Sequence, residues 1–526
     1  MRPSFITQSA VAALAIGFPH SLAQQQCSAP DASKLSVFGA QIQLVTATAI
    51  TNYTGPVVQA NIAPTEVTGL KACNITVTYT HPGQADVINV WVLLPAKWNG
   101  RFQGVGGGGW VAGDPISLLA AASEGYAAAA TDSGHSWSTP DPADWAQVSP
   151  GNVNSYLLND LAHVTLNDMT IIGKQVTEFH YRKPISFSYW NGCSQGGRQG
   201  FMLAQRYPES YDGILATAPG INWVQQIPAL YWPYLYMNKL NYFPSACEID
   251  GITAAVVKAC DKLDGVQDGF ISQYNLCTFK ATSLVGQKVV CPDKSTVIIS
   301  DKAAKLAEAV WSGPQSSNGG RLWYGIEKSA PMNILVSTTC THGNTNCTAA
   351  PAAIAEEWIK YFVTRTRSLD VNTLTFAGFE KIIRQSIDIY NSTMGTSNPN
   401  LSAFKGAGGK LISWHGLSDQ LLHPLNSIDY YQRVEQQDPK IRDFYRLFLA
   451  PGVQHCGFAS VGLVPYSALD QLVQWVEKGV APATLETEGK YPDGKTGNVG
   501  LCPWPLIAEY KKGDPRAANS YVCAKK

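Results

Sequence analysis

The chain has 526 residues, of which 45% are hydrophobic and only 15% charged, and this composition excludes an intrinsically disordered protein. Its 39 basic and 39 acidic residues cancel, so no charge excess favours nucleic acid or an anionic membrane surface as a partner. A chain of this length exceeds one ordinary domain. We therefore expect either two domains or one core with a large insertion.

The N-terminal segment has the pattern of a secretory signal peptide. Arg2 precedes an apolar run over residues 11–18, and small residues follow at Ser21 and Ala23. The run is too short to cross a bilayer, and no later segment is long enough. We predict a secreted, extracellular protein with no membrane partner, whose signal peptide spans residues 1–23.

Strand-like and helix-like stretches alternate through the first part of the chain. An apolar, β-branched run over residues 86–95 predicts a buried strand, and residues 101–105 lead from a second strand into four glycines at 106–109. Such glycines let backbone N–H groups approach a ligand closely, because no Cβ is in the way. Residues 118–130 are apolar and rich in alanine, and residues 155–176 have helical spacing.

A further set of elements surrounds the motif that carries the chemistry. Residues 184–190 form a β-prone run, a glycine-rich turn over 191–197 follows, and residues 198–207 are predicted to be helical. Residues 211–216 have the pattern of the next strand. This alternation predicts a parallel sheet with helices on its faces.

The alternation breaks in the middle of the chain, where aromatic residues, six cysteines and several turn signals accumulate. It returns at residues 409–414 and 444–449, which are two β-prone runs. We therefore predict an α/β fold in which residues 24–220 and 405–526 form one catalytic domain. Residues 221–404 are predicted to form a lid domain inserted over one edge of its sheet.

The sequence Gly192-x-Ser194-x-Gly196 lies between a predicted strand and a predicted helix, which is the pattern of a nucleophile elbow. The turn there must be tight so that the serine Oγ projects from the sheet, and the flanking glycines remove side chains that would clash. The same pattern also occurs in ordinary glycine-rich turns. The strand before it and the helix after it favour Ser194 as a nucleophile.

The order of serine, acid and histidine along an α/β-hydrolase chain can be tested on the two returning strand-like runs. Asp419 follows the first run and His455 follows the second, each where the acid and the base are expected. His415 and His423 are rival bases, but they bracket the proposed acid in one loop and are interpreted as pocket-lining or hydrogen-bonded structural residues. Asp429 is a weaker rival for the acid.

Cysteines adjoin both candidate catalytic residues. Cys193 directly precedes Ser194, and Cys456 directly follows His455. If the serine and the imidazole are in hydrogen-bond contact, the two cysteines are close enough for a disulfide, which would tether the base loop beside the nucleophile turn. Cys193 is itself a rival nucleophile, but the elbow places Ser194 at its apex.

The motifs Gly-Cys-Ser-Gln-Gly-Gly (192–197), Ser-Asp (418–419) and Gly-Val-Gln-His-Cys (452–456) together resemble the Cys-Ser/Asp/His-Cys pattern of the fungal tannase and feruloyl esterase family. The glycine run with Trp110, and Thr-Asp-Ser-Gly-His at 131–135, also resemble that family, so the match covers most of the mature chain. The resemblance implies an α/β-hydrolase fold with a lid, a disulfide joining the two cysteines, and hydrolysis of phenolic acid esters.

The same family carries a calcium site in its lid, and residues 261–270 match that site position by position. Three aspartates and two glycines in this loop suit a hard cation that takes about 6–8 oxygen ligands. A solvated acidic turn is the alternative, but the third aspartate favours calcium, and the flanking Cys260 and Cys277 could brace the loop. No organic cofactor is expected. The residues expected to hold a structural Ca2+, through side chains or backbone carbonyls, are Asp261, Asp264, Val266, Asp268 and Phe270.

Twelve cysteines fit an oxidising compartment, and their even number allows six disulfides. Connectivity cannot be deduced from spacing, so the other pairs are expectations from proximity along the chain or in the expected fold. They are Cys260–Cys277, Cys27–Cys73, Cys340–Cys347, Cys502–Cys523 and, as the remainder, Cys247–Cys291. Sequons for glycosylation lie at Asn52, Asn74, Asn346, Asn391 and Asn400.

These residues together predict a secreted serine esterase that works through an acyl-enzyme. His455 would take the proton from Ser194, and Asp419 would orient the imidazole. The N–H groups of Gln195 and Gly108 would hold the oxyanion.

The expected substrates are small phenolic esters or feruloylated polysaccharide of plant cell walls, from which ferulic, p-coumaric or caffeic acid is released. Galloyl esters, the substrates of a tannase, are the alternative within the same class. A galloyl ring carries three hydroxyls, and the sequence does not show how many hydrogen-bonding groups the pocket offers them. An inactive hydrolase fold used as a binding module is the alternative from another class. A metalloenzyme is disfavoured because no histidine pair has zinc-ligand spacing. Aromatic residues over 223–236 either stack on a phenolic ring or form the lid core.

Overall fold

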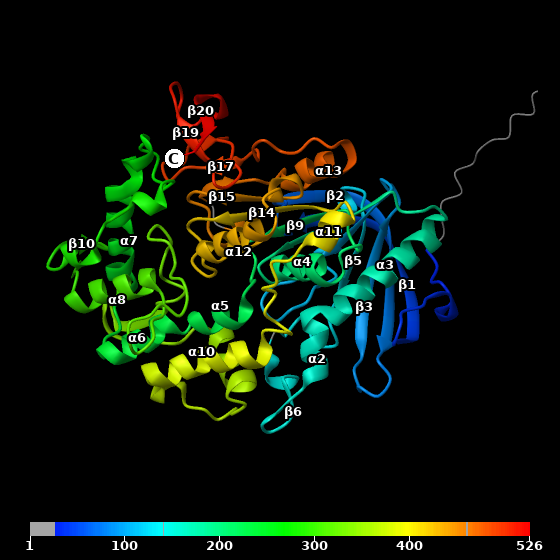
Figure 1. Cartoon of the computed structure of the whole chain (residues 1–526), viewed down its shortest axis with the longest axis horizontal. Coiled ribbons are helices and arrows are strands. Elements are labelled where there is room, and N and C mark those ends of the chain that lie inside the picture. Colours follow the sequence, from blue (N-terminus) through cyan, green and yellow to red (C-terminus); the bar gives the residue numbers. More distant parts are fainter. Residues whose placement is uncertain (1–26, 140, 459–460, 526) are drawn as a thin grey trace, which may run out of the picture.

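A computed structural model describes residues 27–139, 141–458 and 461–525, and a nine-stranded sheet forms the centre of the molecule (Figure 1). The strands lie in the order β1-β2-β3-β5-β4-β8-β9-β14-β15. The first three pair antiparallel, β3 also pairs antiparallel with β5, and all neighbours from β5 to β15 are parallel. The bounds are β1 Gln41–Val57, β2 Thr65–Thr80, β3 Ile88–Pro95, β4 Arg101–Val105, β5 Ala127–Thr131, β8 Phe187–Cys193, β9 Gly213–Thr217, β14 Lys410–Gly416 and β15 Tyr445–Ala450.

Helices cover both faces of the sheet, which explains why the central strands are apolar without alternation. Every residue of β5 and β9 is buried. On one face lie α3 (Thr165–Tyr181), α4 (Gln195–Arg206) and α12 (Pro424–Gln437), whose apolar side chains share a core with the strands. On the other face, α1 (Leu118–Ser123) and α13 (Ala468–Lys478) close a second core.

A large insertion separates β9 from β14 in sequence although these strands are neighbours in the sheet, and Figure 1 shows it in green to yellow beside the sheet. The insertion packs around a core that it shares with residues such as Trp110 and Trp145 from the preceding part of the chain. Trp223, Tyr231 and Trp232 are buried in this core, so these aromatic residues are core residues of the lid. Leu401 and Phe404, near the end of the predicted lid, pack instead in the core of the sheet. The elements are α5 Trp223–Ala229, α6 Trp232–Leu240, α7 Ala246–Cys260, β10 Lys288–Val290, β11 Thr296–Ile298, α8 Asp301–Ser312, β12 Thr338–His342, β13 Thr345–Ala349, α9 Ala353–Glu357, α10 Phe376–Tyr390 and α11 Ser402–Gly406.

Short elements complete the fold around the two ends of the sheet. The C-terminal hairpin of β19 and β20 lies close to the segment after α7 (Figure 1). Residues of both segments line one cavity, so the end of the chain lies between the catalytic sheet and the insertion. The bounds are β6 Gln147–Ser149, β7 Asn152–Val153, α2 Ser155–Asn159, β16 Gly462–Val464, β17 Glu488–Lys490, β18 Thr496–Gly497, β19 Ile507–Tyr510 and β20 Tyr521–Ala524.

The topology agrees with the predicted α/β-hydrolase fold, and two stretches differ in detail from the sequence prediction. The alanine-rich stretch 118–130 splits into α1 and β5 at a turn where Gly125 has a φ of 88°. The predicted helix 155–176 extends to Tyr181 and contains a π-helical turn over Asp160–Val164. A template with a period of 3.6 residues does not include such a turn, because π-helical turns are rare single-turn insertions in α-helices.

Six disulfides join all twelve cysteines in the expected pairs. They are Cys27–Cys73, Cys193–Cys456, Cys247–Cys291, Cys260–Cys277, Cys340–Cys347 and Cys502–Cys523. The predicted signal peptide, residues 1–23, lies outside the described residues. Among the residues that are described, no helix has the length and apolar character needed to cross a bilayer.

Candidate active site

Ser194 occupies a strained turn between β8 and α4, with φ 60° and ψ −118°. A non-glycine residue rarely adopts such a φ, and the strain persists only where the surroundings enforce it. Here the Ser194 N–H donates to the carbonyl of Thr217, and the Ser194 carbonyl accepts from the N–H of Gly220. A Cβ on Gly192 would lie 2.5 Å from the backbone of Gly196, so the tight turn requires glycine at that flank.

The glycine run after β4 packs against this turn. The Gly196 N–H donates to the Gly107 carbonyl at 2.9 Å, and the Gly107 N–H donates to Gln199 Oε1 at 3.2 Å. Within the described part of the chain, no acceptor takes a hydrogen bond from the N–H groups of Gln195 and Gly108. The two groups predicted to hold an oxyanion are therefore not used by the fold itself.

Arg198, on the first turn of α4, was not singled out from the sequence. Its side chain is fully buried, and burial lowers its pKa to about 9. Its Nε donates to the side chain of Gln195 at 2.6 Å, and its terminal nitrogens donate to the carbonyls of Leu161 and Ala162 at 3.0 Å. Arg198 thus anchors the residue that follows the candidate nucleophile. A charged residue two positions after the glycine of the elbow is the signal that sequence reasoning could have used.

Asp419 follows β14 and is fully buried. One carboxylate oxygen accepts from His455 Nδ1 at 2.7 Å and from His415 Nε2 at 3.1 Å. The other accepts from the N–H groups of Leu421 and Leu422, both at 2.8 Å. Burial by itself raises the pKa of Asp419, but the charge of His455 and the hydrogen bonds from both histidines outweigh it and hold this pKa well below its ordinary value.

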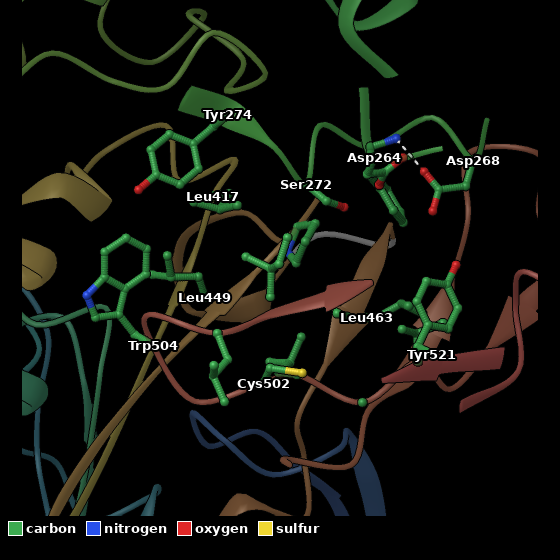
Figure 2. A pocket seen from close by; sticks show the side chains of 18 of the residues that line it. Asp264, Asp268, Ser272, Tyr274, Leu417, Leu449, Leu463, Cys502, Trp504 and Tyr521 are labelled. Atoms are coloured by element: carbon green, nitrogen blue, oxygen red, sulfur yellow. Dashed lines mark hydrogen bonds between the residues drawn. The ribbon is translucent and has the colours of Figure 1, made fainter. Parts of the chain in front are cut away.

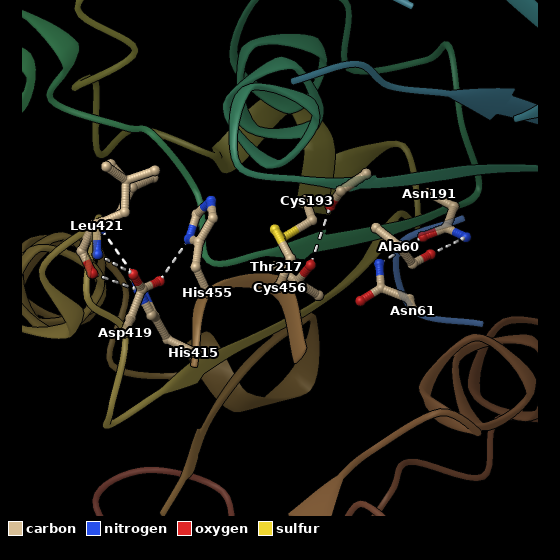
Figure 3. Close-up of a disulfide and its surroundings, with 12 residues drawn as sticks. Ala60, Asn61, Asn191, Cys193, Thr217, His415, Asp419, Leu421, His455 and Cys456 are labelled. Carbon is tan, nitrogen blue, oxygen red and sulfur yellow. Dashed lines mark hydrogen bonds and ion pairs between the residues drawn. A yellow bond between two sulfur atoms is a disulfide. The ribbon is translucent and has the colours of Figure 1, made fainter. Parts of the chain in front are cut away.

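His455 lies in the loop after β15, with 12% of its side chain exposed. Figure 3 shows its ring between Asp419 and the disulfide that joins Cys193 to Cys456. The backbone N–H of His455 donates to Gln420 Oε1 at 3.0 Å. The Cα atoms of the disulfide are 5.9 Å apart, so the residues next to Ser194 and His455 are held together.

The rival residues named from the sequence have other partners. His415 is fully buried and lies between Ser427 and Asp419. His423 is also buried, and burial lowers its pKa to about 4. Asp429 accepts from the hydroxyl of Tyr324 and the guanidinium of Arg433, on the outer side of α12. None of the three pairs with His455 in these contacts.

The predicted calcium loop follows α7, and each of its aspartates uses one oxygen to shape the loop. Asp261 accepts from the N–H of Asp268 at 3.0 Å, Asp264 from that of Val266 at 2.9 Å, and Asp268 from that of Phe270 at 3.0 Å. In the described structure, no hydrogen bond ends on the carbonyl oxygens of Val266 and Phe270. These oxygens and the second carboxylate oxygens are the donors that a hard cation needs.

Electrostatics in the loop also fit a cation. Burial and the neighbouring charges of Asp264 and Asp261 raise the pKa of Asp268 to about 7. Figure 2 shows Asp264 and Asp268 at one end of a cavity whose other lining residues are mostly apolar or aromatic, such as Leu463 and Tyr521. Carboxylates gathered in such a setting repel one another unless a cation or protons compensate. The residues present therefore suit calcium.

The calcium loop also contacts the loop that carries His455. Phe270 stacks on Tyr491 and shares a small apolar cluster with Leu463. A Cβ on Gly452, which has a φ of 71°, would lie 2.1 Å from the ring of Phe270, so the ring lies directly against the backbone there. Gly452 is three residues before His455. The last residue of the calcium loop thus supports the start of the histidine loop.

Four of the five glycosylation sequons have exposed asparagines, namely Asn52, Asn346, Asn391 and Asn400. The fifth, Asn74, is half-buried in β2 between two neighbouring strands.

Comparisons with known proteins give a consistent result along the chain. Residues 73–524 match the family model described as tannase and feruloyl esterase. A probable feruloyl esterase from Arthroderma benhamiae is 41% identical, and the alignment covers 98% of this chain and 96% of that protein.

Solved structures agree in the fold. Tannin acyl hydrolase from Aspergillus niger superposes with a TM-score of 0.85 at 25% identity, covering 94% of each chain. Feruloyl esterase B from Aspergillus oryzae gives a TM-score of 0.77 at 24% identity, covering 94% of this chain and 98% of that one. These likenesses confirm the predicted α/β fold.

Proposed function

The chain belongs to the tannase and feruloyl esterase family, and from this membership and the geometry of its site we propose that it is a serine carboxylic-ester hydrolase that releases hydroxycinnamic acids from plant cell-wall esters. The observation that carries the proposal is the 2.7 Å contact between His455 Nδ1 and the buried Asp419, tied by a disulfide to the strained turn of Ser194. A positioned base beside a serine at the apex of an elbow is the arrangement that acyl transfer needs.

The hydrogen bond from Nδ1 to Asp419 leaves Nε2 of the neutral imidazole of His455 as the proton acceptor. His455 takes the proton from Ser194 Oγ while Oγ attacks the ester carbonyl, and Asp419 stabilises the resulting imidazolium. His455 then returns the proton to the leaving alcohol. A water molecule, activated by the same base, attacks the acyl-enzyme and releases the phenolic acid.

The negative charge that develops on the carbonyl oxygen needs donors that are already in place. The N–H groups of Gln195 and Gly108 take this role in the proposal, because the fold does not use them. Removing one such donor typically costs about 3–4 kcal/mol of transition-state stabilisation. Arg198 holds the side chain of Gln195 and so acts as a positioning residue.

Calcium in the loop of residues 261–270 is part of the proposal as a structural ion. When bound, it supplies positive charge that neutralises Asp261, Asp264 and Asp268. The contact of Phe270 with Gly452 would transmit the order of the loop to the histidine loop. Secretion is proposed because all twelve cysteines are in disulfides, which form and persist in oxidising compartments.

The first test compares the purified enzyme with its Ser194→Ala variant on methyl ferulate, methyl caffeate and methyl gallate. We expect the enzyme to hydrolyse the two hydroxycinnamate esters and the variant to retain its fold, by circular dichroism, with turnover lost. Labelling of Ser194 by a fluorophosphonate probe, mapped by mass spectrometry, checks the nucleophile directly. Absence of any adduct would favour the alternative that the protein is an inactive hydrolase fold used as a binding module. Activity in the Ser194→Ala variant would show that Ser194 is not the nucleophile.

Hydrolysis of galloyl esters is the second candidate. The observation in its favour is that the TM-score with tannin acyl hydrolase, 0.85, exceeds that with feruloyl esterase B, 0.77. The 41% identity with a probable feruloyl esterase favours the first candidate. Exclusive turnover of methyl gallate in the same assay would replace the first candidate by the second.

A further inference from the structure

A buried cluster of one histidine and three aspartates lies outside the candidate active site, where the turn between β2 and β3 meets the start of α3. His81 directly follows β2, and Asp86 comes shortly before β3. Asp160 begins the π-helical turn that leads into α3, and Asp168 lies on α3 itself. Each of the four is more than nine-tenths buried, and Asp160 is only 1% exposed.

Three of these side chains converge on one point. His81 Nδ1 lies 2.6 Å from Asp86 Oδ2 and 3.9 Å from Asp160 Oδ1. One ligand atom from each of the three residues lies within 4.8 Å of the other two. The other oxygen of Asp160 has no hydrogen-bond partner among the described residues. A buried carboxylate oxygen without a partner is costly, and either a proton on the carboxyl group or a cation beside it compensates this cost.

The partners around the cluster orient its atoms as the outer shell of a metal site does. His81 Nε2 lies 3.1 Å from Asp168 Oδ2, and the hydroxyl of Tyr79 donates to the same oxygen. Metal-binding histidines usually give their second ring N–H to a carboxylate in this way. The hydroxyl of Thr80 and the N–H of His81 both donate to Asp86 Oδ1, which leaves Oδ2 turned to the imidazole.

A protonated His81 bridging Asp86 and Asp168 is the simplest metal-free state of this cluster. That state accounts for two carboxylates but leaves Oδ2 of the buried Asp160 without a hydrogen-bond donor among the described residues, so Asp160 would have to carry a proton of its own. The π-helical turn that carries Asp160 also favours a binding site here, because π-turns are rare and occur frequently at functional sites.

We propose that His81 Nδ1, Asp86 Oδ2 and the Asp160 carboxylate bind a divalent transition-metal ion of the zinc type, with water in the remaining coordination position. One imidazole nitrogen and two carboxylate oxygens are a common zinc donor set, and they differ from the all-oxygen set that suits calcium. On binding, the ion replaces the proton shared by His81 and Asp86, which leaves to solvent. Ligand atoms on one tetrahedral zinc lie about 3.3 Å apart, so the pair now at 2.6 Å opens and Asp160 moves closer.

The proposed role of the ion is structural. It would fasten the turn between β2 and β3 to the start of α3 through Asp160. The next two residues, Leu161 and Ala162, give their carbonyls to Arg198, behind the turn of Ser194. The proposal is therefore tested best by measuring the affinity for the metal and the thermal stability of the protein. Neither quantity depends on esterase activity or on the assignment of the triad.

The experiment titrates Zn2+ into the full-length mature protein after treatment with a zinc chelator, with Ca2+ kept saturating throughout. We expect one Zn2+ per chain by calorimetry and by elemental analysis, and a rise in Tm of roughly 1–4 °C at saturation. Co2+ as a second probe should give the intense visible absorption of a tetrahedral site at the same stoichiometry. A wild-type protein that shows neither saturable Zn2+ binding nor this absorption overturns the proposal.

Asp160→Asn is the decisive variant, because it keeps the size of the side chain and removes its charge. We expect it to lose both the Zn2+ binding and the Tm response, yet to be at least as stable as the metal-free wild type, since the unpaired buried carboxylate is gone. The matched control Asp293→Asn changes an exposed aspartate in a distant loop and should keep the Zn2+ response. His81→Gln should behave as Asp160→Asn does. Equal Zn2+ binding by wild type and Asp160→Asn would assign the ion to another site.

Discussion

Asp419 illustrates at the residue scale how burial and hydrogen bonding compete over one charge. A carboxylate that is fully buried would ordinarily take up a proton, but Asp419 accepts four hydrogen bonds, two of them from histidines. Its folded pKa is therefore lower than its unfolded pKa, which is near 4. The stability that Asp419 contributes is present above about pH 4 and fades as the pH falls below that value.

Asp419→Asn should lower kcat by about 10⁴-fold with a smaller effect on KM. The asparagine would keep its oxygen on the N–H groups of Leu421 and Leu422 and turn its NH2 group to the imidazole. His455 Nδ1 would then accept a hydrogen bond, Nε2 would carry the proton, and the ring could no longer act as base. Steady-state kinetics on methyl ferulate measure the effect.

Asp429→Asn is the control for this substitution, because Asp429 is the rival acid and contacts Arg433 and Tyr324 instead of a histidine. We expect its kcat to stay within about twofold of wild type, because its partners Arg433 and Tyr324 make no hydrogen bond to the candidate catalytic residues in the described structure. A larger loss of kcat in Asp429→Asn than in Asp419→Asn would show that Asp429, and not Asp419, is the acid that orients His455.

At the scale of elements, the candidate site depends on two loops that follow neighbouring strands. β14 and β15 pair in parallel, so the loops carrying Asp419 and His455 leave the same edge of the sheet. They are packed without room between them, because a Cβ on Gly416 would lie 2.1 Å from the carbonyl of Val453. The disulfide then fixes the histidine loop to the end of β8.

Replacing Cys193 and Cys456 together by serine should therefore reduce both stability and kcat. The disulfide closes a loop of 263 residues, for which the chain-entropy model gives about 5.6 kcal/mol. The kcat should fall more than KM rises, because the tether positions the base. Thermal unfolding and kinetics on the double variant measure the two effects.

The matched control is the double serine variant of Cys340 and Cys347, whose disulfide spans seven residues within a lid hairpin. We expect a smaller stability loss there, about 2 kcal/mol in the same model, and an unchanged kcat. An unchanged kcat in the variant of Cys193 and Cys456 would mean that packing alone positions His455.

At the scale of the whole molecule, the lid and the catalytic sheet meet at the calcium loop. Phe270, at the end of that loop, packs against Gly452 and stacks on Tyr491, which belongs to the C-terminal part of the chain. The loop is thus held between the insertion and the segment that carries His455. Through this contact, an ordered calcium loop should hold the histidine loop of the active site in place.

Removing calcium with a selective chelator should lower both Tm and kcat, because repulsion among Asp261, Asp264 and Asp268 is no longer compensated. Added Ca2+ should restore both quantities in the wild type but not in Asp268→Asn. Thermal unfolding and kinetics at fixed ionic strength are the measurements. A chelated wild type that keeps its Tm and kcat would show that the loop needs no ion.

The local sequence pattern was sufficient to predict many elements of this molecule and its candidate catalytic residues. The strands that became β3, β8, β9, β14 and β15 were predicted within a few residues, because each is a short apolar run bounded by turn residues. Ser194 was singled out because a strained elbow requires glycine at fixed positions around it, and this requirement is visible in sequence. Asp419 and His455 followed from the chain order that this fold imposes.

Tertiary structure decided what depends on residues distant in sequence. The role of Arg198 arises from carbonyls that a π-helical turn presents, and no sequence spacing records that contact. The cluster of His81, Asp86 and Asp160 contains no histidine pair, so the sequence argument against zinc ligands did not apply to it. Strand pairing and helix packing bring these side chains together, and both are set by burial of the whole core rather than by local propensity. The sequence by itself therefore determined the elements and the order of the candidate catalytic groups, while only the folded chain determined which other groups surround them.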